Sequence, residues 1–294
     1  MRISPRPRGT IGGKARLVVL AMALATGLGA AAAILVSSGC SAAQRAQTET
    51  TLAKALVSDE QSIELGKQLH KELDTQGVKY VHDSDVTGYV EGVAARIFDL
   101  ARKDRTGIDY HVHVIDNPKT VNAFATPGGH IYVYSGLLLQ AENEAELAGV
   151  LGHETGHVAG RHVERAMVNA YGVEALSAVA LGKNPSMAAQ LAAALAGTGV
   201  MSAHSRSEET EADEYGARYL SALGYQPEAM ITFFRKLQAS EGSTPRAMAW
   251  LQTHPVTQDR ISHLKDYIRD NRLRGTELGE SRYASMRSQV PGKS

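Results

Sequence analysis

The stretch that decides the fold of this chain is His153-Glu154-Thr155-Gly156-His157. It stands in a helical pattern that we predict over residues 141–171, with acidic residues near its start and arginines toward its end, as the helix dipole favours. At a spacing of i, i+4 the two imidazoles share one helix face and are close enough to bind the same zinc ion. Glu154 is rotated by about 100° from His153 and can therefore reach a water molecule on the open side of the metal.

A third metal ligand is expected from the acidic segment SRSEETEADE, residues 205–214. Glu209 and Asp213 again stand at i, i+4, so one carboxylate can bind the metal while the other supports a ligand. Charge alone does not choose Glu209 over Glu208, and the other acidic side chains fit a solvated helix face. A third histidine ligand does not fit the spacing, because the metzincin pattern requires histidine where Val163 stands. His162 comes one residue early, and we interpret it as structural.

The N-terminal segment is typical of an export signal. Residues 1–39 carry five basic residues and no acidic one, and an uncharged run over residues 17–39 precedes Cys40, the single cysteine. The ending Ser37-Ser38-Gly39-Cys40 is similar to a bacterial lipobox, although Ser37 stands where leucine is usual. An uncleaved signal anchor is the alternative, because these 23 uncharged residues can span a bilayer. Both readings place the rest of the chain outside the cytoplasm, tethered to a membrane.

The composition excludes one class of partner and divides the chain into four regions. Without the first 39 residues, 26 basic residues face 31 acidic ones, so the chain has no basic footprint for nucleic acid. We predict an export signal of lipoprotein type over residues 1–39 and a lipidated Cys40 with its tether over residues 40–57. A zinc metallopeptidase domain follows over residues 58–273, and a polar C-terminal tail, expected to be loose, over residues 274–294.

The hydrophobic periodicity predicts an α+β fold that is mostly α-helical. Ser84 is a candidate N-cap, and Pro127-Gly128-Gly129 is a strong turn signal between two strands. We predict helices over residues 58–76, 85–102, 141–171, 208–223, 227–239 and 258–271, strands over residues 108–115 and 130–134, and a helical hairpin over residues 172–203.

Four segments in order give this chain a family resemblance: NAFATPGGHIYVYSGLL (122–138), GHETGHVAGRH (152–162), SRSEETEADEYGARYL (205–220) and THPVTQDR (253–260). Together they resemble the gluzincin family of zinc metallopeptidases that contains the CAAX prenyl proteases, HtpX, and the Oma-type and BepA-type proteases. The resemblance covers about residues 58–264 and is closest to the short lipoprotein members of the family. It implies a zinc metalloendopeptidase that binds one Zn²⁺ per chain.

The resemblance also implies roles for individual residues. His153, His157 and Glu209 match the family's zinc ligands, and Glu154 matches its base. Asp213 matches a residue that orients a ligand, or in some accounts donates a proton. His254 lies in a stretch that is close to the metal in BepA-like members. It can act either as an inhibitory ligand that displaces the catalytic water or as a group that stabilises the tetrahedral intermediate.

The resemblance further implies that the HExxH helix packs beside a small β-sheet with an edge strand for substrate. In the family, the strand that follows the PGG turn lies at the edge of the sheet, where a peptide can add as an extra strand. We therefore expect substrate contacts from Asn122, Phe124, Gly128, Gly129 and His130. An ordinary hairpin turn is the alternative for this segment. Recognition through the backbone implies extended substrates, which we expect to be unfolded or misfolded envelope proteins.

We expect a lipoprotein of the bacterial cell envelope that faces the periplasm, held at the outer membrane, in protein quality control or outer-membrane protein maturation. Two rival functions are a chaperone or adaptor that retains the zinc fold, and an amidase that acts on cell-wall peptides. The intact Glu154 disfavours the adaptor, because a scaffold does not need a base, and extended-strand recognition disfavours the amidase.

Several histidines outside the motif have no predicted function. His111 and His113 share one face of a predicted strand and superficially resemble a metal pair, but we interpret them as ordinary strand residues. For the others we expect typical surface or core roles: His70, His82, His204 and His263.

Overall fold

The computed structural model describes residues 57–198, 204–240 and 248–292. The predicted export signal, Cys40 and nearly all of the tether lie outside the described residues. Within these ranges the elements are α3 (Asp59–Thr75), α4 (Ser84–Asp104), β1 (His111–Ile115), β2 (Ala123–Ala125), the 3₁₀ turn η1 (Pro127–Gly129), β3 (His130–Tyr134), α5 (Ser135–Gln140), α6 (Glu144–Ala159), α7 (His162–Tyr171), α8 (Val173–Ala180), α9 (Pro185–Thr198), α10 (Arg206–Ala222), α11 (Ala229–Ser240), α12 (Met248–Thr253), α13 (Gln258–Asp270) and α14 (Glu280–Arg287).

The predicted fold class is confirmed, since the described chain is mostly helical around one small mixed sheet. The strand order is β1-β3-β2, with β1 parallel and β2 antiparallel to β3. One expectation was wrong in detail: β3, the strand after the PGG turn, lies at the centre of the sheet rather than at its edge. The residues before the turn form a strand of their own, and β2 takes the edge position. The first predicted strand is also shorter, beginning at His111 rather than at residue 108.

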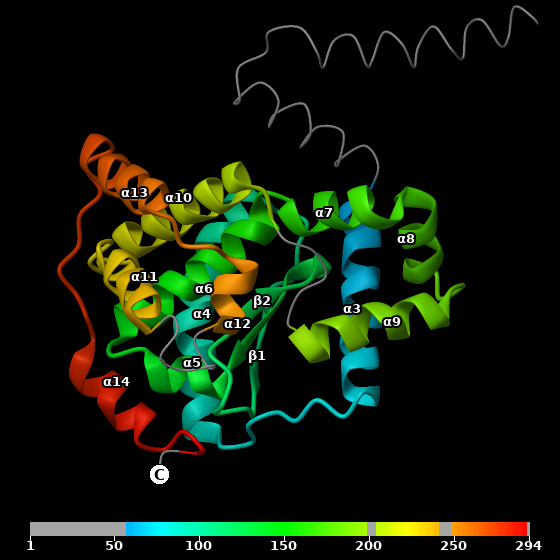
Figure 1. The fold of residues 1–294 in the computed structure, drawn as a ribbon, viewed down its shortest axis with the longest axis horizontal. Coiled ribbons are helices and arrows are strands. Elements are labelled where there is room, and N and C mark those ends of the chain that lie inside the picture. The colour runs from blue at the N-terminus through cyan, green and yellow to red at the C-terminus, as the bar shows by residue number, and fades with distance from the viewer. Residues whose placement is uncertain (1–56, 199–203, 241–247, 293–294) are drawn as a thin grey trace, which may run out of the picture. The chain divides into compact units, whose positions relative to one another are not determined.

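The central strand β3 is buried on both faces, so its sequence does not alternate between apolar and polar residues. Ile131 and Val133 face the main hydrophobic core, which includes residues of α4 and α6. Tyr132 and Tyr134 face a second cluster, which contains Phe124 of β2 and residues of α3 and α9. Figure 1 shows α3 and the α7–α9 arm on one side of the sheet and α10, α11 and α13 on the other.

Helix α6, which carries the HExxH motif, packs most extensively against α10. The two helices approach closely where glycines face each other, and a Cβ atom added to Gly152 would lie 3.1 Å from the Cα of Gly216. Asn143 caps the start of α6 by accepting a hydrogen bond from the backbone N–H of Glu146. Helix α10 begins with a capping box at Ser205, and this cap stabilises the first turn of the helix.

The long helix predicted over residues 141–171 is two helices, α6 and α7. The chain turns at Arg161, which adopts a left-handed conformation with φ of 58°. This conformation is held by distant parts of the chain, because the Arg161 guanidinium donates to Asp59 Oδ1 at 2.5 Å and to Val57 O at 3.1 Å. The periodicity runs through this break, so only tertiary contacts reveal it.

The uncharged stretch after α7 forms two helices, α8 and α9, over residues 173–198. This pair agrees with the helical hairpin predicted over residues 172–203, of which residues 199–203 lie outside the described residues. Both helices pack on α3, and Ala192 and Leu195 of α9 cover the aromatic side of the sheet. Among the described residues, no helix combines the length and apolar character needed to cross a bilayer.

The end of the chain is not a loose tail, which corrects the expectation from its polar composition. Helix α14 lies against the rest of the fold, and Tyr283 is fully buried with its hydroxyl donating to Leu138 O at 2.8 Å. Arg282 donates to both carboxylate oxygens of Glu144 in α6, at 2.6 and 2.9 Å. Tyr283 and Arg282, together with the buried Met286 and Val290, therefore hold this largely polar segment against the fold. A smaller correction concerns α4, whose N-cap is Asp83 rather than Ser84.

Candidate active site

The HExxH residues lie on a buried face of α6. His153 and His157 have no exposed surface, Glu154 is 1% exposed, and the two imidazole Nε2 atoms are 3.1 Å apart. Burial, followed by the neighbouring His204, lowers the pKa of His157 well below its usual value. His157 is therefore neutral at physiological pH, which is the form that binds a metal.

Helix α10 brings two carboxylates to this face. Glu209 Oε2 lies 3.6 Å from His153 Nε2, and Glu209 Oε1 lies 3.5 Å from His157 Nε2. Burial favours protonation of Glu209, but His254 and His157 outweigh it and hold the pKa of Glu209 well below its usual value. Asp213, one turn later, accepts a hydrogen bond from His153 Nδ1 at 2.9 Å. Glu208 is instead paired with Arg165 at 3.0 Å, away from these atoms.

The donor set fits a zinc ion. Tetrahedral ligands at about 2.0–2.1 Å from zinc are separated from one another by roughly 3.3–3.4 Å. The three distances among His153, His157 and Glu209 range from 3.1 to 3.6 Å. Because Asp213 accepts the proton of His153 Nδ1, the Nε2 lone pair of that ring faces the other donors, as metal coordination requires.

His254 follows α12 directly and lies among the same atoms. Its Nδ1 is 2.9 Å from Glu209 Oε1 and 3.3 Å from His153 Nε2, and its Nε2 is 3.4 Å from Glu154 Oε1. The ring stacks on Trp250 with centroids 5.0 Å apart. Burial opposes protonation, but the carboxylates of Glu209 and Glu154 outweigh it and raise the pKa of His254. The imidazole can therefore either hydrogen-bond these carboxylates or join the ligand atoms.

Arg260 completes the carboxylate side of the site, and the sequence alone assigned it no role. Its guanidinium lies 2.7 Å from Glu209 Oε2 and donates to both oxygens of Asp213, at 2.9 and 2.8 Å. One arginine of α13 thus neutralises both carboxylates that α10 directs to the histidines. The signal that could have found it is the arginine at the end of the THPVTQDR segment.

His162 and His204, which seemed unremarkable in the sequence, both contact His157. His162 Nε2 donates to Glu211 Oε2 at 3.2 Å, so its Nδ1 in the neutral ring accepts from His157 Nδ1 at 2.9 Å. This hydrogen bond leaves the Nε2 lone pair of His157 free for a metal. His204 stacks on the His157 ring with centroids 4.0 Å apart. The interpretation of His162 as outside the ligand set agrees with this geometry, but its contact with His157 was missed.

The five residues predicted to contact substrate are divided between two parts of the structure. Asn122 and Phe124 belong to the edge region of β2, where Phe124 stacks on Tyr132 of the central strand. Gly128 and Gly129 have positive φ angles and pack tightly against α3 and against residues 108–110 before β1, which explains the glycines without a ligand. His130 hydrogen-bonds His113 across the sheet at 3.0 Å.

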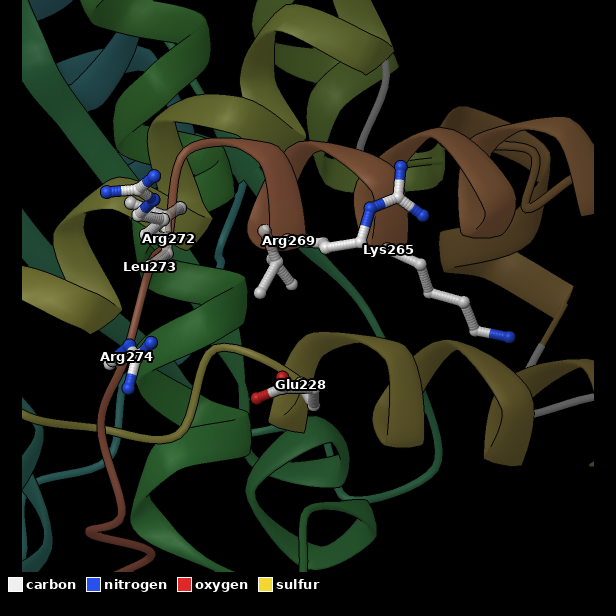
Figure 2. Close-up of a pocket in the computed structure, with 7 residues that line it drawn as sticks. Glu228, Lys265, Arg269, Arg272, Leu273 and Arg274 are labelled. Atoms are coloured by element: carbon white, nitrogen blue, oxygen red, sulfur yellow. The ribbon is translucent and has the colours of Figure 1, made fainter.

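A pocket at the end of α13 lies apart from these residues. Its volume is about 360 Å³, and Figure 2 shows its basic side chains. Arg269 is already paired with Asp266 and Asp270, at 2.7 and 2.8 Å. None of the predicted site residues lines this pocket, which is formed by Glu228, Lys265, Ile268, Arg269, Arg272, Leu273 and Arg274.

Comparison with known proteins agrees with this geometry. The model of peptidase family M48 matches residues 83–268. The mitochondrial metalloendopeptidase OMA1 of Schizosaccharomyces pombe is 33% identical over 62% of this chain and 53% of its own length. The beta-barrel assembly-enhancing protease of Escherichia coli is 31% identical over 76% of this chain and 47% of its own length. This chain thus spans about half the length of these two relatives.

A third relative is similar over nearly its whole length. The metalloprotease LoiP of Escherichia coli is 30% identical over 86% of this chain and 96% of its own length. The HExxH motif on α6, the carboxylates on α10 and the family model point to the same class of enzyme. The chain belongs to peptidase family M48 as a metallopeptidase.

Proposed function

We propose that this metallopeptidase is a zinc-dependent endopeptidase that cleaves extended or misfolded proteins of the bacterial cell envelope. In this proposal one Zn²⁺ per chain is held by His153, His157 and Glu209. The observation that carries it is the convergence of two imidazole nitrogens and one carboxylate at 3.1–3.6 Å from one another in a buried site. The imidazole protons on the far side are taken up by Asp213 and His162, so the lone pairs point inward.

Glu154 is the general base of the proposed reaction. The chemistry that bound zinc supplies is polarisation of the scissile carbonyl and a lower pKa, toward ~7, for a water molecule. Glu154 takes the proton of the attacking water and delivers it to the leaving amine. The buried position of Glu154 strengthens its electrostatic interactions with the reacting groups, because water competes less there.

The edge strand β2 supports recognition of an extended substrate. Asn122 O accepts from Tyr134 N, and Thr126 N donates to His130 O, so alternate residues of β2 bond to β3. By the alternation of an antiparallel pair, the backbone groups of Ala123 and Ala125 point away from β3. In this proposal a peptide adds beside β2 through its backbone and takes over the Ala123 N–H, which donates to Asn122 Oδ1 at 3.0 Å in the buried strand. Such binding fits broad specificity for chains that have lost their fold.

The cellular setting is inferred from the N-terminal sequence. A basic start, an apolar run and the lipobox-like ending before Cys40 support export and lipid attachment. We therefore place the enzyme at the outer membrane, facing the periplasm and held by an N-terminal lipid. One relative is named a beta-barrel assembly-enhancing protease, which favours substrates among envelope proteins during maturation or quality control.

Two measurements test the proposal. Cleavage of an unfolded protein such as casein by the purified protein should stop on chelation and return with one equivalent of zinc. Envelope proteomics should show misfolded or immature proteins that accumulate with the inactive Glu154→Gln variant and disappear with the active enzyme. Zinc-independent cleavage would overturn the metal assignment. Identical envelope proteomes with the two forms, at equal protein levels, would overturn the substrate assignment.

A further inference from the structure

Three histidines from three different elements meet beside the sheet. His70 of α3, His113 of β1 and His130 of β3 each offer a ring nitrogen, and these nitrogens lie within 4.8 Å of one another. His113 Nε2 and His130 Nδ1 are 3.0 Å apart in nearly coplanar rings. His70 stacks over both, with centroids 4.4 Å from His113 and 5.3 Å from His130. We call these three residues the peripheral histidine cluster.

We propose that the peripheral histidine cluster is a second metal site, which binds a divalent ion such as Zn²⁺ or Ni²⁺ and ties α3 to the sheet. Imidazole nitrogens favour these borderline ions over Mg²⁺ and Ca²⁺, which prefer oxygen. This site uses none of the proposed catalytic ligands.

The protonation state of the cluster suits metal binding. Burial, followed by the neighbouring histidines, lowers the pKa of His113 to about 3 and that of His130 to about 4. Both rings are therefore neutral at physiological pH, so a metal need not displace a proton from an imidazolium. In their hydrogen bond one ring donates its N–H to the other, so a metal can bind both facing nitrogens once the donor ring carries its proton on its other nitrogen.

To reach coordination geometry the His70 ring must turn out of its stack on the other two, because an imidazole lone pair lies in the plane of its ring. Ligands of a tetrahedral zinc ion are separated by roughly 3.3–3.4 Å, so no nitrogen pair needs to close by more than about 1.5 Å. His113 and His130 are already closer than that separation. His70 is half-buried and can supply the remaining movement by side-chain rotation. Its Nδ1 lies 2.9 Å from the Tyr132 hydroxyl, an outer contact of the kind that orients metal-binding histidines.

A metal bound by the peripheral histidine cluster would link α3 to the two paired strands β1 and β3. Residues 113 and 130 lie on the paired strands β1 and β3, whereas α3, which carries residue 70, is joined to this region by packing around the PGG turn. A metal that binds the folded chain but not the unfolded one increases stability in proportion to the logarithm of its concentration. We therefore expect added zinc to raise the melting temperature through this site.

Two substitutions remove a ligand while keeping its hydrogen bond. In His113→Gln, the amide can replace the Nε2 contact with His130. In His70→Asn, the amide can replace the Nδ1 contact with Tyr132. His82→Gln is the matched control, because His82 is exposed and lies outside the cluster. Glu209→Ala removes a proposed catalytic ligand and separates the two sites, so this inference does not rest on the proposed function.

The test measures bound metal and thermal shifts in the full-length protein after equilibration with ZnCl₂ or NiCl₂. We expect His113→Gln and His70→Asn each to bind one equivalent less than the unmodified chain and to show a smaller zinc-dependent rise in melting temperature, namely the rise that the catalytic site alone produces. Glu209→Ala and His82→Gln should keep both properties of this site. Equal metal content and equal thermal shifts in His70→Asn and the unmodified chain would overturn the proposal, and circular dichroism confirms that each variant is folded.

Discussion

Helix α6 carries buried polar side chains near both of its ends, and the two sets differ in the hydrogen-bond partners that surround them. At its start, Glu144 is surrounded by donors: it accepts from Arg282 twice, from Arg96 at 2.9 Å, and from the hydroxyls of Tyr225 and Tyr89. Toward its other end, acceptor lone pairs of His153 and His157 face the Glu209 carboxylate.

The difference teaches how to distinguish a buried structural charge from a ligand site. A carboxylate with a donor on each lone pair is satisfied and joins α4, α14 and the segment after α10 to α6. In the second set Glu209 is contacted by Arg260 and His254, but the facing Nε2 lone pairs of His153 and His157 are acceptors, which a cation between them would satisfy. We call the first set the Glu144 anchor and the second the catalytic cluster. Substitutions in the anchor should change stability, and substitutions in the cluster should change metal binding or activity.

The largest effect is expected from Glu154→Gln. Removing the base should lower peptidase activity by about 10²–10⁴-fold, because glutamine keeps the shape but cannot accept the proton. Zinc content and the free energy of unfolding should remain close to those of the unmodified chain. Undiminished casein cleavage by a zinc-loaded Glu154→Gln protein would remove Glu154 as the base.

Glu209→Ala should sharply lower zinc occupancy, since it removes a proposed ligand from the catalytic cluster. Glu208→Ala is the matched control one residue away, because Glu208 contacts Arg165 and the Ser205 cap instead. Zinc content measured after dialysis distinguishes the two variants. If Glu208→Ala lost zinc and Glu209→Ala retained it, the register of the third ligand would be wrong.

His162 should act through His157, as a positioning residue. His162→Leu removes the acceptor at His157 Nδ1 and should weaken zinc affinity by about 10–100-fold, the usual effect of losing such a contact. His162→Asn places an amide oxygen near the same position and should restore part of the affinity. Zinc titration with a competing chelator measures both. Equal affinities in the Leu variant and the unmodified chain would return His162 to a packing role.

Glu144→Gln tests the anchor. Loss of the charge-assisted bonds should lower the free energy of unfolding by about 2 kcal/mol at pH 7. Burial opposes ionisation of Glu144, but bonds from Arg282, Tyr225, Tyr89 and Arg96 outweigh it and lower its pKa to about 2, from 4.5 in the unfolded chain.

A depressed pKa stabilises the fold above the unfolded value, and this stabilisation disappears as pH falls through the folded one. The difference between Glu144→Gln and the unmodified chain should therefore be constant above about pH 5 and shrink as the pH falls from 4.5 toward 2. Urea unfolding at several pH values measures it. Activity per folded molecule should not change, and a large loss of activity in the folded variant would contradict the division between anchor and cluster.

The smallest effect is expected from His254→Ala. His254 Nδ1 lies among the ligand atoms, and an imidazole bound there would occupy the position that the catalytic water needs. We expect basal proteolysis to rise several-fold at matched zinc occupancy. A drop in activity with zinc still bound would instead assign His254 to stabilisation of the transition state. His263→Ala, at an exposed histidine, is the control.

The sequence by itself determined the features that depend on local spacing. The i, i+4 pairs place His153 with His157 and Glu209 with Asp213, because a helix turn brings such residues to one face. The PGG turn, the strand over residues 130–134 and the α8–α9 pair were also predicted, since short-range hydrogen bonds and backbone preferences fix them. The acidic run could not by itself choose Glu209 over Glu208, and the family resemblance made that choice.

Tertiary structure alone decided the features that join distant residues. It placed β3 at the centre of the sheet, ended α6 at a left-handed Arg161, and held the polar tail against Glu144. It also brought Arg260 between two carboxylates 47 or more residues earlier, and His70 over a pair of strand histidines. Each of these contacts depends on which buried surfaces pack together. The local periodicity of a segment does not indicate which distant segment it will contact.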